Sequence, residues 1–283
     1  SDGSERFDTH FDLAVSYIEG GSAYYVHDHV SAAKKAAFIH VDYVQAGYTR
    51  RLDKDCYMDF DRIFAVSDET AGVFAGVYPE CQQKLSVFHN LIDTETIRQK
   101  ALLPAEKAMH EGIRLLTVGR LTPQKGFDCA VYALKLLLEK QYPVYWYIIG
   151  EGPEYGRLTQ LARSLHVEDH FIFLGMQTNP YPYFKMTDFY IHATRFEGKS
   201  IAIQEAQVLG CAIAASDCSG NREQIVSGVD GLLCPFSPEG IANAVEYLIE
   251  HPQTAESFGR AAAQKACHFE NDIHMIRDLL YSP

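Results

Sequence analysis

Short apolar runs that alternate with helix-like stretches constrain this chain most strongly, and the alternation is most regular from Ile113 onward. The apolar runs show little polar alternation, as expected of strands that are covered on both faces. Predicted strands lie at residues 113–118, 145–149, 171–174, 189–192, 212–215 and 231–234. Predicted helices lie at residues 127–140, 155–165, 200–209 and 238–250. Strands that are separated by helices indicate an α/β fold with a parallel sheet.

The first part of the chain shows the same pattern with fewer strands. Predicted strands lie at residues 11–18, 36–41, 62–67 and 84–89, and a helix is predicted at 68–77 with Asp68 as its N-cap. Such a thin sheet suggests an incomplete domain at residues 1–93, whose opening half is absent from this sequence. We expect a polar linker at 94–111, a second domain at 112–268 and a C-terminal helix at 269–283.

Composition excludes several classes of function. The chain has 283 residues, enough for two ordinary domains, and a net charge of −12, which argues against non-specific binding of nucleic acid. Its seven cysteines show no C-x-x-C spacing and no N-x-S/T sequon occurs, so we expect reduced core cysteines and a cytoplasmic protein. No apolar run approaches the roughly 18 residues of a membrane helix.

Two glutamates flank the start of the helix predicted at 200–209. Glu197 is expected in the loop at the carboxyl end of a strand, where ligands bind in open α/β sheets, and Glu205 within the helix. The backbone N–H groups of Gly198, Lys199 and Ser200 would suit an anionic or hydroxyl-rich ligand. The alternative is that one glutamate complements the helix dipole while the other lies on a solvated face.

A second stretch suits a diphosphate. Gly119 allows a tight turn after the strand at 113–118, and Arg120 and Lys125 place two cations before a helix that begins near Gly126. The stretch is neither a Walker loop nor a G-x-G-x-x-G motif. Two solvated cations in a loop are the alternative.

Glycines also mark two further strand exits, at Gly150 and Gly175, and would leave room for a flat ligand such as a nucleotide base. Plain turns would explain them as well. His40 ends a strand in the first domain and could face a cleft, or it could be a structural histidine. No H-E-x-x-H motif occurs, and we expect no metal and no other cofactor.

These motifs, in this order, resemble the family-four retaining glycosyltransferases, which have the GT-B fold of two facing Rossmann-like domains. The matching stretches of the second domain are residues 118–126, 150–153, 173–175, 196–206, 221–223 and 230–235. Those of the first domain are residues 39–42, 65–67 and 89–93, which correspond to the acceptor-side domain from its middle onward. The family usually has an aromatic and a small residue or Pro where Lys199 and Ser200 stand here, which leaves the identity of the sugar open.

The resemblance implies a role for each site residue. Arg120 and Lys125 would hold the diphosphate, Glu197 would contact the hydroxyls of the donor sugar, Glu205 would bind the ribose, and His40 would lie near the sugar. The residues implied as catalytic are therefore Glu197, His40, Arg120 and Lys125. Those implied in donor binding are Gly119, Gly150, Gly175, Gly198, Lys199, Ser200, Ile201 and Glu205.

The function implied is retaining transfer from a nucleotide-diphosphate sugar, most commonly a UDP-sugar in this family, to a glycan or lipid-linked acceptor in polysaccharide or glycoconjugate synthesis. A lipid-linked acceptor would bring peripheral contact with the inner face of a membrane. A donor phosphate oxygen would take the acceptor's proton, so neither a protein base nor a metal is implied. The alternatives are an inactive nucleotide-sugar-binding module, a glycoside hydrolase, whose paired carboxylates would not need the cations, and an epimerase.

Overall fold

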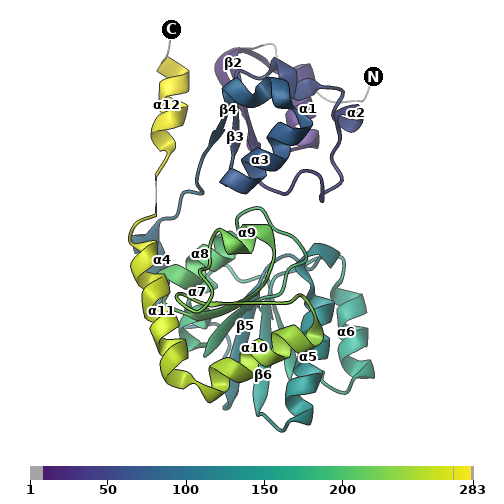
Figure 1. Cartoon of the computed structure of the whole chain (residues 1–283), viewed down its shortest axis with the longest axis vertical. Helices are drawn as coiled ribbons and strands as arrows, with labels where there is room; N and C mark the ends of the chain where they lie inside the picture. The colour runs from purple at the N-terminus through teal and green to yellow at the C-terminus, as the bar shows by residue number, and fades with distance from the viewer. Residues whose placement is uncertain (1–8, 270, 282–283) are drawn as a thin grey trace. The chain divides into compact units, whose positions relative to one another are not determined.

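The computed structural model describes residues 9–269 and 271–281, and its chain divides into two compact units (Figure 1). The first unit extends to Leu91 and also includes Glu197–Lys199 and the C-terminal segment from residue 271. The second unit contains Ile92–Phe196 and Ser200–Phe269. In the described part of the chain, no helix combines the length and the hydrophobicity needed to cross a bilayer.

The second unit is built on a six-stranded parallel sheet, which confirms the α/β prediction. Its strands are β5 (Ile113–Val118), β6 (Val144–Ile149), β7 (Phe171–Gly175), β8 (Phe189–His192), β9 (Ala212–Ser216) and β10 (Leu232–Cys234). Their order in the sheet is β10-β9-β8-β5-β6-β7. From β5 the chain builds the sheet outward on one side through β6 and β7, and then crosses to the other side to add β8, β9 and β10. The direction in which strands are added therefore reverses between β5 and β8. Ligands bind at such a switch point, outside the carboxyl ends of the strands.

Helices cover both faces of this sheet (Figure 1). They are α4 (Thr94–Lys100), α5 (Phe127–Glu139), α6 (Tyr155–Ser164), α7 (Tyr181–Met186), α8 (Ile201–Val208), α9 (Ser219–Arg222), α10 (Pro238–Glu250) and α11 (Pro252–Ala266). Successive β6 residues alternate between two cores: Trp146 packs in the core that contains α5 and α10, and Tyr147 in the core that contains α7 and α8. Because both faces are apolar, the strands lack polar alternation.

The sequence did not predict α4, α7 or α11. Helix α4 lies within residues 94–111, where a linker was expected, and its Ile97 packs against Val208 of α8 and Ala266 of α11. At seven residues, α4 is too short to be stable alone, so its tertiary contacts decide that it forms. The predicted start of α10 is confirmed, because the Ser237 hydroxyl accepts a hydrogen bond from Gly240 N with Pro238 in the first turn.

The first unit contains a four-stranded parallel sheet in the order β1-β2-β3-β4. The strands are β1 (His10–Ser16), β2 (Ser31–Ile39), β3 (Arg62–Ala65) and β4 (Leu85–Val87). The helices are α1 (Gly21–His29), α2 (Arg50–Asp53), α3 (Asp68–Val77) and α12 (Ile273–Tyr281). The prediction of Asp68 as the N-cap of α3 is wrong: the Ser67 hydroxyl accepts from Thr70 N at 3.1 Å, and Asp68 is the first helical residue.

Helix α12 belongs to the first unit although it is remote in sequence. Its Leu279 is buried in a core with Phe38, Phe64 and Phe88, and Lys34 Nζ donates to the Leu279 carbonyl oxygen at 2.9 Å. Before the helix, the Asp272 carboxylate accepts from the backbone N–H of His89 at 2.7 Å. The C-terminal segment therefore completes the core of the first unit. The expectation that most cysteines are reduced core residues is met by Cys56, Cys81, Cys129, Cys211 and Cys234, which are buried and free.

Candidate functional site

Three glycines meet where β5, β6 and β7 end. Gly150 has φ of +139°, and a Cβ added there would lie 2.0 Å from the Gly119 carbonyl oxygen, so only glycine fits. Gly150 N donates to the Gly175 carbonyl oxygen at 2.9 Å, and Gly119 N to the Ile149 carbonyl oxygen at 3.0 Å. The predicted glycine exits of Gly119, Gly150 and Gly175 therefore form one continuous backbone edge.

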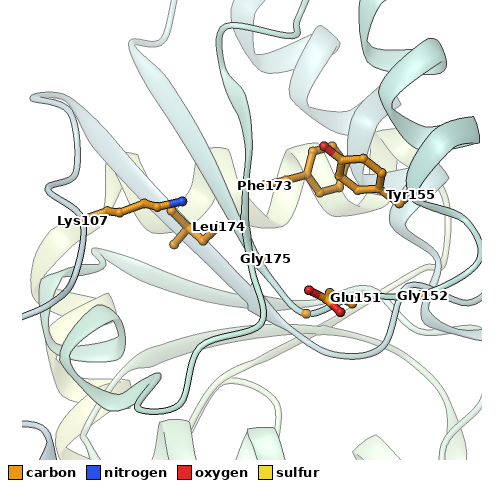
Figure 2. Close-up of a pocket in the computed structure, with 8 residues that line it drawn as sticks. Lys107, Glu151, Gly152, Tyr155, Phe173, Leu174 and Gly175 are labelled. Atoms are coloured by element: carbon orange, nitrogen blue, oxygen red, sulfur yellow. The ribbon is translucent and has the colours of Figure 1, made fainter.

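A cavity of about 510 Å³ opens at this edge (Figure 2). It is lined by Lys107, Gly150, Glu151, Gly152, Tyr155, Phe173, Leu174 and Gly175. Figure 2 shows the Tyr155 and Phe173 rings together, with Lys107 reaching in from a different segment. The two rings meet edge to face, with centroids 5.0 Å apart at 69°. Planar walls beside bare backbone suit a flat aromatic ligand.

Sequence reasoning did not include Lys107, Tyr155 or Phe173 among the site residues. Tyr155 could have been found from its place just after the Gly150-Glu-Gly-Pro exit, and Phe173 from the strand that ends at Gly175. Lys107 carries no comparable signal, because it lies in an irregular segment that the chain folds back toward β7.

The two predicted phosphate cations flank a tight turn before α5. Arg120 is exposed, and the Lys125 side chain runs within 3.7 Å of the position that a Cβ on Gly119 would occupy. Gly126 has φ of +63°, and a Cβ there would lie 2.2 Å from the Ala193 carbonyl oxygen. This glycine lets the chain turn directly into α5. The turn thus places Lys125 next to Gly119, which itself touches the cavity-lining Gly150.

Glu205 lies within α8, as predicted, and Ser200 precedes the helix as its N-cap, accepting from Ile203 N at 3.4 Å. The Tyr181 hydroxyl donates to Glu205 Oε1 at 3.0 Å. Burial raises the pKa of Glu205, and this hydrogen bond opposes the rise. Ile201, in the first turn, is 48% exposed. The helix therefore has an exposed residue in its first turn and a half-buried carboxylate one turn further on.

Glu197, Gly198 and Lys199 group with the first unit, as does His40. A Cβ on Gly198 would lie 2.0 Å from the His40 carbonyl oxygen, so the backbone approaches there only because the residue is glycine. Asn90 Nδ2 donates to the Lys199 carbonyl oxygen at 3.1 Å. Glu197 is buried. The predicted site residues therefore fall into two groups: Glu197, Gly198 and Lys199 with His40 in the first unit, and the others in the second unit.

The short helix α9 follows β9, and its buried Asn221 Nδ2 donates to the Ser216 carbonyl oxygen at 2.8 Å. Within residues 9–269 and 271–281, no group of three or more His, Cys, Asp or Glu side chains is arranged to hold a metal ion.

Comparisons with known proteins agree on one family. The family model described as "Glycosyl transferases group 1" matches residues 95–265. A relative from Campylobacter jejuni, named N-acetylgalactosamine-N,N'-diacetylbacillosaminyl-diphospho-undecaprenol 4-alpha-N-acetylgalactosaminyltransferase, is 30% identical over 70% of this chain and 53% of its own length. An uncharacterized glycosyltransferase from Haemophilus influenzae is 33% identical over 54% of this chain and 44% of its own length. The chain thus spans about half the length of these relatives.

Solved structures share the fold at low sequence identity. A glycosyltransferase from Rickettsia africae superposes with a TM-score of 0.77 at 17% identity, covering 96% of this chain and 78% of its own. Anabaena Alr3699/HepE in complex with UDP-glucose gives a TM-score of 0.74 at 18% identity, covering 87% of this chain and 71% of its own. At such identities, the likeness establishes the GT-B type of architecture and no more.

Proposed function

Because this chain belongs to the group 1 glycosyltransferase family, we propose that it transfers a sugar, with retention, from a nucleotide-diphosphate sugar to an acceptor hydroxyl. The observation that carries the proposal is the cavity at the β6 and β7 ends, next to a turn that presents Arg120 and Lys125. A UDP-sugar is the donor to test first, since Anabaena Alr3699/HepE has been solved with UDP-glucose.

The nucleotide base enters the cavity and packs on Tyr155, while bare backbone at Gly150 and Gly175 lets it approach the sheet edge. Glu205 accepts hydrogen bonds from the ribose hydroxyls. Its carboxylate suits this task because it is oriented by Tyr181 and partly shielded from water, where a hydrogen bond to a charged acceptor is strong.

Arg120 and Lys125 supply the main electrostatic contribution. As the bond between the sugar and the diphosphate breaks, negative charge grows on the departing phosphate, and fixed cations stabilise that charge more than the ground state. Glu197 and His40 contact the hydroxyls of the donor sugar and hold the reacting carbon in place. The acceptor attacks from the face that the diphosphate leaves, and a donor phosphate oxygen takes the acceptor's proton, which gives retention without a protein base.

The acceptor to assay first is a lipid-linked glycan. The name of the Campylobacter relative gives a diphospho-undecaprenol-linked sugar as its acceptor. We extend this acceptor class to the present chain, which implies peripheral contact with a membrane surface.

Substitutions at the two groups of site residues test the proposal. We expect Lys125→Ala to lower kcat by about 10²–10³-fold, the usual cost of removing one preorganised donor of this kind. Glu197→Ala should also lower kcat strongly, because a sugar contact is lost. The matched control is Lys135→Ala on α5, where Lys135 pairs with Glu139 at 3.4 Å and should leave turnover unchanged. Near-normal turnover in both site variants would contradict the assignment.

Ligand-dependent thermal stability separates the rival functions. UDP at 100 times its Kd should stabilise the protein by about 2.7 kcal/mol, because it binds only the folded state. Free sugar alone should not. Protection by sugar but not by any nucleoside diphosphate would favour a glycoside hydrolase. Protection by UDP without turnover of a labelled UDP-sugar would favour an inactive nucleotide-sugar-binding module.

A further inference from the structure

Glu19 is a buried acidic residue in the first unit, at the same sheet edge as His40. It lies in the loop between β1 and α1, while His40 directly follows β2. Strands β1 and β2 pair in parallel, with Ser16 opposite Ala37, so their carboxyl ends lie together. Glu19 Oε2 accepts the backbone N–H of His40 at 2.9 Å, and the same oxygen lies 3.9 Å from His40 Nδ1.

The loop that carries Glu19 is held in place on several sides. The Ser16 hydroxyl donates to the Ile18 carbonyl oxygen at 2.8 Å, and Gly20 N donates to the Tyr57 hydroxyl at 3.3 Å. Gly20 has φ of +74°, and a Cβ there would meet the Tyr48 hydroxyl at 2.8 Å, so the loop packs closely only with glycine. The carboxylate position is therefore built into the fold.

His40 Nδ1 and Glu19 are each incompletely satisfied. Nδ1 is buried and has no hydrogen-bond partner among the described residues, although a buried polar atom without one is costly. The Glu19 side chain is 6% exposed, and a carboxylate can accept more than the backbone bond that it receives here. A separation of 3.9 Å is long for a hydrogen bond, but such contacts are often loose before substrate binds and shorten in the complex.

The part of the His40 ring that lies away from Nδ1 is accessible to a ligand. The side chain is 24% exposed although Nδ1 is buried, so the exposed part of the ring lies away from Glu19. The Tyr17 ring packs edge-on against the imidazole at 4.9 Å and Phe38 stacks at 5.9 Å, which limits how the ring can rotate. One ring nitrogen thus faces the buried carboxylate while the other side is left for a ligand.

We propose that Glu19 is a positioning residue that holds the proton of the neutral His40 imidazole on Nδ1 and leaves Nε2 as a hydrogen-bond acceptor for a hydroxyl of the donor sugar. In a neutral histidine, the hydrogen-bond partners of the two ring nitrogens decide which nitrogen carries the proton. A carboxylate can only accept a hydrogen bond, so Glu19 beside Nδ1 favours the tautomer with the proton on Nδ1. This inference rests on the proposed function for the ligand, but the tautomer itself can be measured in the free protein.

The surroundings of His40 favour the neutral form of its ring. Burial lowers the pKa of His40, and the Glu19 carboxylate partly offsets this. The other titratable groups of the cluster are Tyr17, against the ring, and Tyr48, whose pKa is raised by burial and then by the Glu19 charge. Among these groups, Glu19 is the one whose charge acts on the His40 ring.

The test compares the full chain with Glu19→Gln. A glutamine oxygen can still accept the His40 backbone N–H, but its amide donates to Nδ1 and favours the Nε2–H tautomer instead. Nitrogen-15 NMR of histidine-labelled protein, with the signal assigned through its loss in His40→Asn, should show Nδ1 protonated in the wild type and Nε2 protonated in Glu19→Gln. Glu19→Asp, which keeps a carboxylate, should retain part of the wild-type tautomer.

Kinetics supply the functional readout. With UDP-glucose as donor, Glu19→Gln should lower kcat by about tenfold or more while thermal protection by UDP stays unchanged. The acid limb of its kcat/KM profile should move to lower pH, because the carboxylate no longer opposes the effect of burial. The control is Asp42→Asn, two residues from His40, whose carboxylate is occupied by Val44 N, Gln45 N and Gln45 Nε2 and which should leave the His40 tautomer as it is.

Two outcomes would overturn the proposal: a wild-type His40 protonated on Nε2, or a Glu19→Gln protein whose tautomer and kcat match the wild type. The wild-type spectrum decides the first even if the variant does not fold. Failure of the proposed function looks different, since the wild type would then neither be protected by UDP nor consume any nucleotide sugar, whatever its tautomer.

Discussion

The buried position of the Glu205 carboxylate lowers the stability of the protein when no ligand is bound. It lies half-buried in α8, its one described hydrogen bond comes from the neutral Tyr181 hydroxyl, and burial raises its pKa. A carboxyl whose pKa is higher in the folded than in the unfolded state stabilises the fold fully below its unfolded pKa, and this stability is lost as the pH rises through the folded pKa. At neutral pH, the charged Glu205 is therefore held at the expense of stability.

Glu205→Gln should consequently raise Tm at pH 7–8, because the neutral amide removes the desolvation penalty, and each 1 kcal/mol gained raises Tm by roughly 2–4 °C. The gain should vanish near pH 4, where the wild-type carboxyl is also neutral. The same variant should lose much of its protection by UDP, since the ribose contact is weakened. Thermal melts across pH, with and without UDP, measure both effects.

A matched control for this variant is Glu246→Gln on α10. The hydrogen bond from Lys140 at 2.6 Å lowers the pKa of Glu246, so neutralising it should not raise Tm. If both variants gained equally, the effect would reflect the overall negative charge of the protein rather than the buried position of Glu205.

At the scale of secondary-structure elements, the carboxyl ends of β5 and β6 contact each other through backbone atoms rather than through side chains. Gly150 brings its Cα against the Gly119 carbonyl and occupies a region of φ that L-residues avoid. The close approach forms the bare floor of the cavity, so the strand ends carry both the stability and the ligand site.

Gly150→Ala should destabilise the second unit by about 1–3 kcal/mol or more, because the new methyl group would lie 2.0 Å from the Gly119 oxygen and the backbone is strained. It should also weaken protection by UDP. The control is Gly156→Ala in α6, where nothing lies within 4 Å of an added Cβ and alanine should stabilise the helix by up to about 1 kcal/mol. An unchanged Tm for Gly150→Ala would contradict the described turn.

For the whole molecule, the main consequence of the fold is that the two units have separate cores. Trp146, the single tryptophan, is fully buried in the second unit, so its fluorescence reports the unfolding of that unit. The first unit depends on α12, whose Leu279 completes a core with Phe38 and Phe64.

Leu279→Ala should therefore cost about 2–5 kcal/mol, the usual range for a buried leucine, in the first unit alone. The transition followed by circular dichroism should broaden toward lower temperature, while the fluorescence transition of Trp146 stays in place. Tyr281→Ala, at a side chain that is 78% exposed on the same helix, is the control and should change stability by less than about 0.5 kcal/mol. Equal shifts in both signals would show that the two cores unfold together.

Secondary-structure elements were predicted correctly from the sequence where all the residues that indicate an element lie close together in the chain. The strands of the second unit and α10 were found because apolar runs, Ser237 and Pro238 act within a few residues of each other. Helices α4 and α7 were missed because they are short and form through contacts with distant helices. The N-cap of α3 was placed one residue late, since Ser67 and Asp68 are both good caps and only the backbone angles distinguish them.

By itself, the sequence determined the α/β class, the family, the strand ends that Gly119, Gly150, Gly175 and Glu197 follow, and the helix that carries Glu205, because periodicity and motif order are properties of neighbouring residues. Tertiary structure alone decided that Lys107 and Tyr155 share a cavity, that Tyr181 holds Glu205, and that a buried Glu19 faces His40. The members of each pair are separated in the chain, and they meet because the strands, helices and loops between them pack together, which no local pattern encodes.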